Sequence, residues 1–390
     1  MKLVRITTLG LALIASVAQA QVTIKATNKL PIARASQTIE ISAKDLPQPG
    51  RGQTLANIHI KDSSGKEVLA QAVDTDFDRV HAFDMVIFQA DFAPNESKTF
   101  TAELGEKPFI TDDQFKAHGR FVRERFDDFA WENDRIAHRM YGKALETWEG
   151  EPLTSSTIDI WSKRTPKMVQ DKWYMMDDYH VDHGEGYDDY SAGESRGDGG
   201  SGLWTNDQLF VSKNFVNSRV LTNGPIRVMF ELDYDPFDVA GAKISETKRI
   251  TLDAGSNLDH IQSTYKVVSG QPALPLTVAI GLKKTGGEQK ELDAAKGILM
   301  KWEPMEKRGG NQGLAAIVDP KSYVKDAETT GRAASWLILA KADANNSISY
   351  WAGFCWDKGG YNLDTFDAWK KYVNEFAQSA ASPIEVSVSK

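Results

Sequence analysis

A glycine-rich segment of the chain carries two histidines and a glutamate close together. It spans residues 177–204 and reads DDYHVDHGEGYDDYSAGESRGDGGSGLW. A histidine exchanges protons near neutral pH with little tuning, and a tyrosine or a glutamate can supply a second proton. We therefore expect proton-transfer chemistry in this segment, with His183 or His180 as the base and with Tyr190, Glu185 or the other histidine as the acid.

The same residues have the types that bind a divalent metal. His180, His183 and Glu185 can share one ion such as zinc only if the loop folds back on itself, because residues three apart in a regular strand face opposite sides. The alternative is a solvated surface loop. A loop of this length in a compact domain is more often functional, so we favour a functional role.

One arginine of this segment has the geometry for binding an anion. Arg196 lies among glycines, where the backbone can approach a ligand closely. Its guanidinium group can grip a substrate carboxylate with two parallel hydrogen bonds, which a lysine cannot do. We expect Arg196 to bind a carboxylate.

A second segment mixes one indole with several polar side chains. Indole rings stack on the apolar faces of sugars, and sugar hydroxyls need both donors and acceptors. We therefore interpret this run, together with two other tryptophans, as a candidate sugar-binding surface; ion pairs along a strand edge are the alternative. The candidates are Trp131, Glu132, Asn133, Asp134, Arg135, Trp204 and Trp356.

A third segment alternates carboxylates as the opening of a calcium loop does. Asp74, Asp76 and Asp78 have that spacing, but Arg79 stands where the EF-hand requires glycine and Met85 where it requires glutamate. Any calcium ion bound here would be structural, and an ordinary polar turn is the alternative.

Most of the chain has the pattern of short antiparallel strands. Apolar and polar residues alternate in QTIEIS, DMVIFQADF and RVMFELDY. Turns are expected at Ser63-Ser64-Gly65 and at Ala254-Gly255-Ser256-Asn257. The expected fold is therefore mainly β, a sandwich of antiparallel sheets, with residues 21–390 as one large domain and residues 21–115 as a candidate sub-domain.

One helix is expected near the end of the chain. Apolar residues recur at helical spacing after Asp364, a candidate N-cap, and Pro383 then opens a last strand, IEVSV. The apolar face consists of Phe366, Trp369, Tyr372, Val373 and Phe376.

The N-terminal segment, the net charge and the cysteine count restrict the compartment and the partners of the protein. Residues 1–20, MKLVRITTLGLALIASVAQA, resemble a signal peptide with cleavage after Ala20, which predicts a periplasmic or secreted protein. No later apolar run is long enough for a membrane span. The net charge of −8 and the absence of a basic run exclude nucleic acid as a partner, and the single cysteine, Cys355, excludes an intramolecular disulfide.

Five blocks in this order resemble the exported bacterial family DUF4861 over nearly the whole mature chain. They are AQAVDTDFD with DMVIFQADF, DDFAWENDRIAHRMYGKAL, DYHVDHGEGYDDYSAGESRGDGG, RVLTNGPIRVMFELDY and GFCWDKGG. The resemblance implies a galactose-mutarotase-like β-supersandwich and genes placed near those for pectin and other uronate-polysaccharide breakdown. It assigns no reaction, because a fold alone does not fix one.

The leading hypothesis is an enzyme that acts on uronic-acid-containing, pectin-like oligosaccharides. It would work by β-elimination, as a lyase, or would process the unsaturated uronides that elimination leaves. Elimination requires a base, an acid and a group that neutralises the carboxylate, for which Arg196 is the candidate, helped by Arg135 or a metal.

Three alternatives remain open. A hydrolase would use a pair of carboxylates drawn from Glu132, Asp134, Glu185 and Asp189. A mutarotase or epimerase is suggested by the fold resemblance. A non-catalytic periplasmic carbohydrate-binding protein would use its tryptophans to stack on an oligosaccharide or polysaccharide, and no feature of the sequence indicates an oligomeric state.

Overall fold

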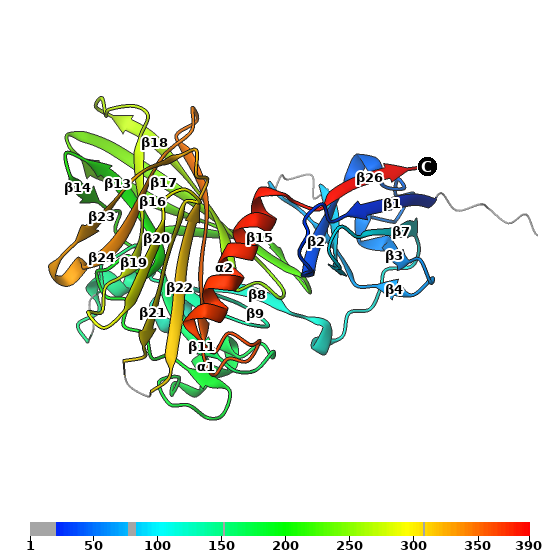
Figure 1. The fold of residues 1–390 in the computed structure, drawn as a ribbon, viewed down its shortest axis with the longest axis horizontal. Helices are drawn as coiled ribbons and strands as arrows, with labels where there is room; N and C mark the ends of the chain where they lie inside the picture. The colour runs from blue at the N-terminus through cyan, green and yellow to red at the C-terminus, as the bar shows by residue number, and fades with distance from the viewer. Residues whose placement is uncertain (1–20, 77–82, 151–152, 307–308) are drawn as a thin grey trace, which may run out of the picture.

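The computed structural model describes residues 21–76, 83–150, 153–306 and 309–390. They form a smaller and a larger lobe, both built of antiparallel sheets (Figure 1). The expected signal peptide and Asp78 lie outside the described residues. Within the described chain, no helix is long and apolar enough to cross a bilayer.

The smaller lobe consists of two sheets around a separate apolar core. One has the order β26 (Glu385–Ser389), β1 (Gln21–Thr27), β7 (Ser97–Leu104), β3 (Ile58–Asp62) and β4 (Glu67–Val68). The other has the order β2 (Arg34–Ser42), β6 (Met85–Phe92) and β5 (Ala70–Val73). Strict alternation in β1 buries Val22, Ile24 and Ala26 between the two sheets. The sequence did not predict that β26 joins this lobe.

The larger lobe is built on an eight-stranded sheet, here called the broad sheet. Its order is β15 (Asn217–Asn223), β16 (Arg227–Val239), β17 (Ala242–Asp253), β18 (Leu258–Ser269), β25 (Ser347–Trp356), β22 (Asn311–Val318), β21 (Ile298–Pro304) and β20 (Gln289–Asp293). The expected turn at 254–257 joins β17 to β18, and the turn at 63–65 follows β3, so both predictions are confirmed.

Two five-stranded sheets cover one face of the broad sheet. The groove sheet has the order β14 (Gln208–Phe210), β13 (Asp198–Thr205), β19 (Thr277–Lys283), β24 (Ser335–Lys341) and β23 (Tyr323–Thr329). The loop sheet has the order β12 (Gly186–Tyr187), β11 (Asp159–Lys163), β10 (Ala137–Met140), β9 (Asp128–Asn133) and β8 (Ala117–Val122).

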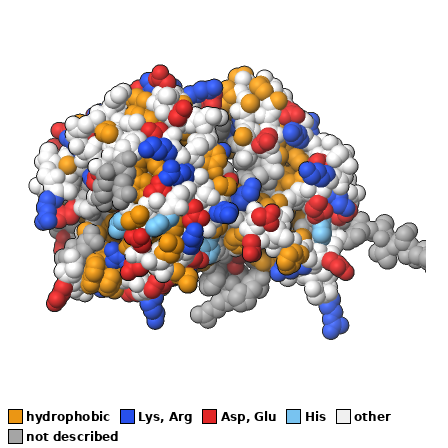
Figure 2. Space-filling model, turned by 90° about the horizontal axis from the view of Figure 1, so that it is seen from below, with side chains coloured by type: hydrophobic (Ala, Val, Ile, Leu, Met, Phe, Trp, Pro, Cys, Tyr) orange, Lys and Arg blue, Asp and Glu red, His pale blue; other side chains and the backbone are white. Residues whose placement is uncertain are grey.

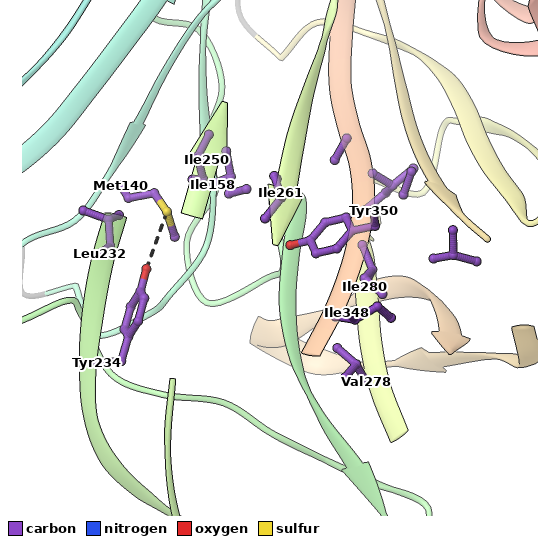
Figure 3. Close-up of a cluster of buried hydrophobic side chains, with 14 of the residues drawn as sticks. Met140, Ile158, Leu232, Tyr234, Ile250, Ile261, Val278, Ile280, Ile348 and Tyr350 are labelled. Carbon is purple, nitrogen blue, oxygen red and sulfur yellow. Dashed lines mark hydrogen bonds between the residues drawn. The ribbon is translucent and has the colours of Figure 1, made fainter. Parts of the chain in front are cut away.

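The main core fills the space between the broad sheet and the two smaller sheets. Ile261 and Tyr350 from the broad sheet lie near Val278 and Ile280 from the groove sheet (Figure 3). Further along the core, the Tyr234 hydroxyl contacts the Met140 sulfur at 3.5 Å. This apolar layer fixes where the opposite, outer faces of the two smaller sheets lie, and those faces carry the polar sites.

Helix α2 (Phe366–Ala381) covers the outer face of the broad sheet (Figure 1). Trp369 and Val373 are buried against β21 and β22, as the periodicity predicted. The cap differs from the prediction, because the side chain of Thr365, not Asp364, accepts a hydrogen bond from the backbone N–H of Ala368. The mainly β fold with antiparallel sheets and a C-terminal helix is confirmed; its mutarotase-like assignment stays a prediction.

A short helix, α1 (Gln170–Met176), was not predicted. Trp173 and Tyr174 of α1 pack with Tyr179 onto Trp161 of β11, with ring centroids 4.7–5.6 Å apart. A helix this short depends on such tertiary contacts, because its own hydrogen bonds do not offset the cost of nucleation.

Candidate functional site

The loop that follows α1 lies against the outer face of the loop sheet, which carries buried charges. Arg139 of β10 stands opposite Asp159 of β11, and Asp128 lies on the same face of β9. The Arg139 guanidinium donates to Asp159 at 2.7 Å and to Asp188 of the loop at 3.1 Å. This arginine therefore fixes Asp188 below the loop surface.

His180 is held against this buried carboxylate. Its Nδ1 lies 3.1 Å from the backbone carbonyl oxygen of Asp188 and 3.6 Å from the Asp188 carboxylate, and its side chain is 56 % exposed. Because a carbonyl oxygen only accepts, Nδ1 must carry the hydrogen. In the neutral ring the lone pair is then on Nε2, the form in which an imidazole acts as a base.

His183 and Glu185 make surface pairs instead. His183 Nε2 lies 2.9 Å from Asp178, and Lys172 donates to Glu185 at 2.6 Å. Figure 2 shows histidines at the surface of the larger lobe among acidic and basic side chains. The structure does not gather His180, His183 and Glu185 as a group of metal ligands within the described chain.

A different acidic group has ligand atoms close enough to share an ion. One carboxylate oxygen each from Asp74, Asp76 and Asp84 lie within 4.8 Å of one another. The backbone N–H and hydroxyl of Thr75 both donate to Asp84 at 2.6 Å, as in an ordinary polar turn. Sequence spacing predicted the first two residues and missed Asp84, which the chain returns to this place.

Tyr190 points into the protein. Burial raises the pKa of its hydroxyl well above the usual value, and the nearby Glu303 raises it further, so the hydroxyl stays protonated at neutral pH. The Lys283 ammonium lies 5.4 Å from its ring centroid. Tyr190 has the protonation state of a proton donor but lies below the surface.

The side chains of the second predicted segment, residues 131–135, make contacts that stabilise the fold. Trp131 is fully buried between the rings of His138 and Phe230, with Nε1 donating to Asp259 at 3.0 Å, so it presents no face to a sugar. Glu132 accepts from Lys163 at 2.6 Å and from two backbone N–H groups at the start of α1.

The next three residues of that segment are held in the same way. Asn133 donates to the carbonyls of Asp253 and Ser256, and Asp134 accepts from the backbone N–H of Gly255. Arg135 donates to Asn257 and lies 4.4 Å from the ring centroid of Tyr361.

Sequence reasoning missed the buried histidine of this region. His138 of β10 is fully buried, with Nε2 3.1 Å from Asp198 and Nδ1 3.2 Å from Asp259. The two carboxylates raise its pKa against the effect of burial. The sequence did indicate that His138 faces the opposite side of the strand from Ala137 and Arg139, since neighbours in a strand face opposite sides.

The remaining predicted sugar-binding residues separate into one buried and one accessible tryptophan. Trp356 is buried in an edge-to-face contact with Tyr187 at 5.8 Å and lies beneath Arg164. Trp204 is partly exposed and lines a groove of about 450 Å³ together with Arg196. The guanidinium hydrogen bonds of Arg196 go to serines 155, 156 and 201 and to the Glu194 carbonyl. None goes to His180, Asp188 or Arg139, which are called the His180 group from here on.

Comparison with solved structures shows a shared fold. An alpha-mannosidase from Enterococcus faecalis V583 matches with a TM-score of 0.53 and 10 % identity over 95 % of this chain and 46 % of that chain. A protein in glycosyl hydrolase family 38 from Enterococcus faecalis matches with a TM-score of 0.52 and 10 % identity over 95 % and 47 %. The chain thus spans about half the length of these proteins.

Sequence comparison is more specific. "Uncharacterized protein P7" of Formosa agariphila is 34 % identical over 378 residues, which cover 93 % of this chain and 92 % of that protein. The model of the family DUF4861, a domain of unknown function, matches residues 26–386. The resemblance seen in the five sequence blocks is therefore confirmed, and this chain belongs to the DUF4861 family.

Proposed function

We propose that this protein is a carbohydrate-active enzyme of the periplasm or cell exterior that acts on uronic-acid-containing oligosaccharides. It catalyses β-elimination or processes the unsaturated uronides that elimination produces. The observation that carries the proposal is the pairing of the half-exposed His180 with the buried Asp188, which Arg139 holds in place. The residues 1–20 support export.

The chemistry needs a base that can take a proton. In elimination, the base takes the proton from the carbon beside the carboxylate, the electron pair forms the new double bond, and the glycosidic oxygen leaves as it gains a proton. His180 meets the first need because the acceptors on its Nδ1 side place the lone pair on Nε2. The carboxylate of Asp188 also stabilises the imidazolium that forms.

The structural comparisons support a sugar as substrate. One of the two structures described above is named an alpha-mannosidase and the other a protein in glycosyl hydrolase family 38, and their likeness to this chain is one of fold. The gene neighbourhood implied by the family resemblance supports a uronate polysaccharide such as pectin.

The test is the ultraviolet absorbance of the conjugated double bond. The mature protein is mixed with polygalacturonate, rhamnogalacturonan or alginate, and with their unsaturated oligosaccharides, with and without calcium or zinc. A rise from polymer supports elimination, and a fall from unsaturated oligosaccharides supports their processing. His180→Ala should lower the rate about 10²- to 10⁴-fold, the range that acid–base catalysis contributes.

His183→Ala is the matched control, because His183 lies in the same loop and pairs with the exposed Asp178. It should keep the rate within about threefold, since exposed pairs contribute little. Unchanged absorbance with every substrate contradicts the proposal, and equal effects of the two substitutions contradict the role of His180.

A non-catalytic carbohydrate-binding protein is the second candidate. It is favoured by the groove beside Trp204, which has the size of a small-ligand site. Binding of an acidic oligosaccharide without any change of absorbance would support this candidate over the enzyme.

A further inference from the structure

The outer face of the groove sheet carries a groove with an unusual charge at its base. The groove has a volume of about 450 Å³, enough for a ligand of about one or two sugar rings. The lining residues that matter here are Glu194, Arg196, Trp204, Asp207, Gln208 and Glu328. They come from β13, from the turn before β14, from β14, from β23 and from the loop that precedes β13.

Gly281 on β19 leaves the space that the Arg196 side chain occupies. Val278, Ile280 and Leu282 point into the main core, so Gly281 between them lies on the outer face. A Cβ atom on Gly281 would lie 2.6 Å from the Cγ of Arg196. The missing side chain therefore lets the arginine lie flat against the sheet.

The Arg196 guanidinium is buried without an anion. Its side chain donates only to neutral acceptors, namely the hydroxyls of Ser155 and Ser156 and the carbonyls of Ser201 and Glu194, at 3.0–3.4 Å. Across the described ranges no carboxylate pairs with it, and its Nε has no hydrogen-bond partner. Burial lowers the pKa of Arg196 to about 10, which still leaves it charged at neutral pH.

The buried carboxylate that acts on Arg196 through space is already neutralised. Glu246 raises the pKa of Arg196 through space, but it accepts from Lys248 at 2.7 Å. Lys248 also donates to Ser201 and Ser263. The interior therefore supplies no free negative charge to the arginine.

The carboxylates of the groove are also each paired with a cation. Lys284 contacts Glu328 at 2.9 Å and Lys325 contacts Asp207 at 3.0 Å. Arg332 lies 3.6 Å from Glu194. Because these charges cancel, Arg196 leaves the groove with one uncompensated positive charge among the described side chains, and an unpaired buried charge is costly until an anion arrives.

We propose that this groove binds an acidic sugar, with its carboxylate on Arg196 and its ring against Trp204. The carboxylate can accept from the Nε–H of Arg196, which has no hydrogen-bond partner among the described residues. The partly exposed indole offers a face for stacking, and Gln208 supplies a donor and an acceptor for hydroxyls. The groove is separate from the His180 group, so it serves as a binding subsite for the substrate class of the proposed function, on which the choice of sugar rests.

The test is titration calorimetry of the mature protein with trigalacturonate and with the neutral galactotriose. Trigalacturonate should bind at least about tenfold more tightly, and raising the salt concentration should weaken only its binding. Trp204→Ala should weaken trigalacturonate binding about tenfold or more. Trp148→Ala is the matched control, since Trp148 is partly exposed but stacks on Phe126 away from the groove, and it should leave binding unchanged.

Arg196→Lys should weaken trigalacturonate binding because it removes the Nε–H donor, while thermal unfolding reports whether the variant still folds. If it does not fold, Trp204→Ala still decides. Equal affinity for the acidic and neutral sugars, no binding at millimolar concentration, or an unchanged affinity of Trp204→Ala overturns the inference. His180→Ala should still bind trigalacturonate. If the parent protein binds trigalacturonate but turns over none of the tested substrates, the proposed function is contradicted and this inference still stands.

Discussion

At the scale of single residues, burial divides the carboxylates of the larger lobe into two kinds. Asp178 is exposed beside His183, whereas Asp188 is buried and tied to Arg139. The composition of the loop indicated chemistry, and residue types alone predicted histidines as bases. Which carboxylate turns inward depends on a partner 49 positions away in the sequence, which no local pattern reveals.

Asp128 should make stability fall as the pH rises. Burial raises its pKa from the usual 3.8 to about 7, although Arg139, Arg125 and a backbone hydrogen bond from Gly142 lower it. Between about pH 4 and pH 7 the folded protein therefore holds a proton that the unfolded chain has released. The contribution of Asp128 to the free energy of unfolding decreases by at most about 1.4 kcal/mol per pH unit across this range.

Asp128→Asn removes this dependence, so its free energy of unfolding relative to the parent protein should rise from pH 5 to pH 8. Urea unfolding followed by tryptophan fluorescence measures the difference. A difference between Asp128→Asn and the parent that stays constant or falls with pH contradicts the shifted pKa.

At the scale of elements, periodicity predicted the amphipathic strands and the long helix but missed the shortest strand and helix. The two strands on either side of residues 254–257 follow from alternation, and the helix that contains Trp369 follows from helical spacing. The two-residue β12 and the seven-residue α1 have no period to detect. Both are held by contacts with β11, which become visible only in the assembled sheet.

The turn between Arg196 and β13 should tolerate no side chain at Gly197. Its φ is +59°, and a Cβ there would lie 2.0 Å from the carbonyl oxygen of Ile158. Gly197→Ala therefore combines backbone strain with a backbone clash and should lower the free energy of unfolding by about 2–4 kcal/mol.

Gly193→Ala is the matched control, because Gly193 has a similar φ of +56° in the same loop but open space around its Cβ position. It should cost only about 1–2 kcal/mol from the left-handed backbone. Denaturant unfolding of both variants separates strain from clash. Equal losses would show that the contact with Ile158 is relieved by a backbone shift.

At the scale of the whole molecule, the end of the chain connects the two lobes. Helix α2 packs on the broad sheet, and the next strand, β26, pairs with β1 of the smaller lobe (Figure 1). Arg34 of the smaller lobe donates to the carbonyls of Ser379 and Ser382. A strand IEVSV was expected from the sequence, but its partner was not, because a pairing between distant segments leaves no local signal.

Removal of residues 383–390 should destabilise the smaller lobe selectively. Ile384, Val386 and Val388 pack half-buried on its core, so their loss should cost about 2–4 kcal/mol. Hydrogen exchange should accelerate in β1 and β7, while β16 to β18 of the larger lobe serve as the internal reference. Uniform acceleration in both lobes would show that they unfold as one cooperative unit.

The pairing of β1 with β26 also sets an order of assembly. A ribosome releases β1 first and β26 last, so the sheet that begins earliest is the last to be completed. Until then one edge of β1 presents unpaired N–H and C=O groups, the kind of edge that joins strands of other chains. The smaller lobe therefore has an open sheet edge until β26 pairs with β1 and closes it.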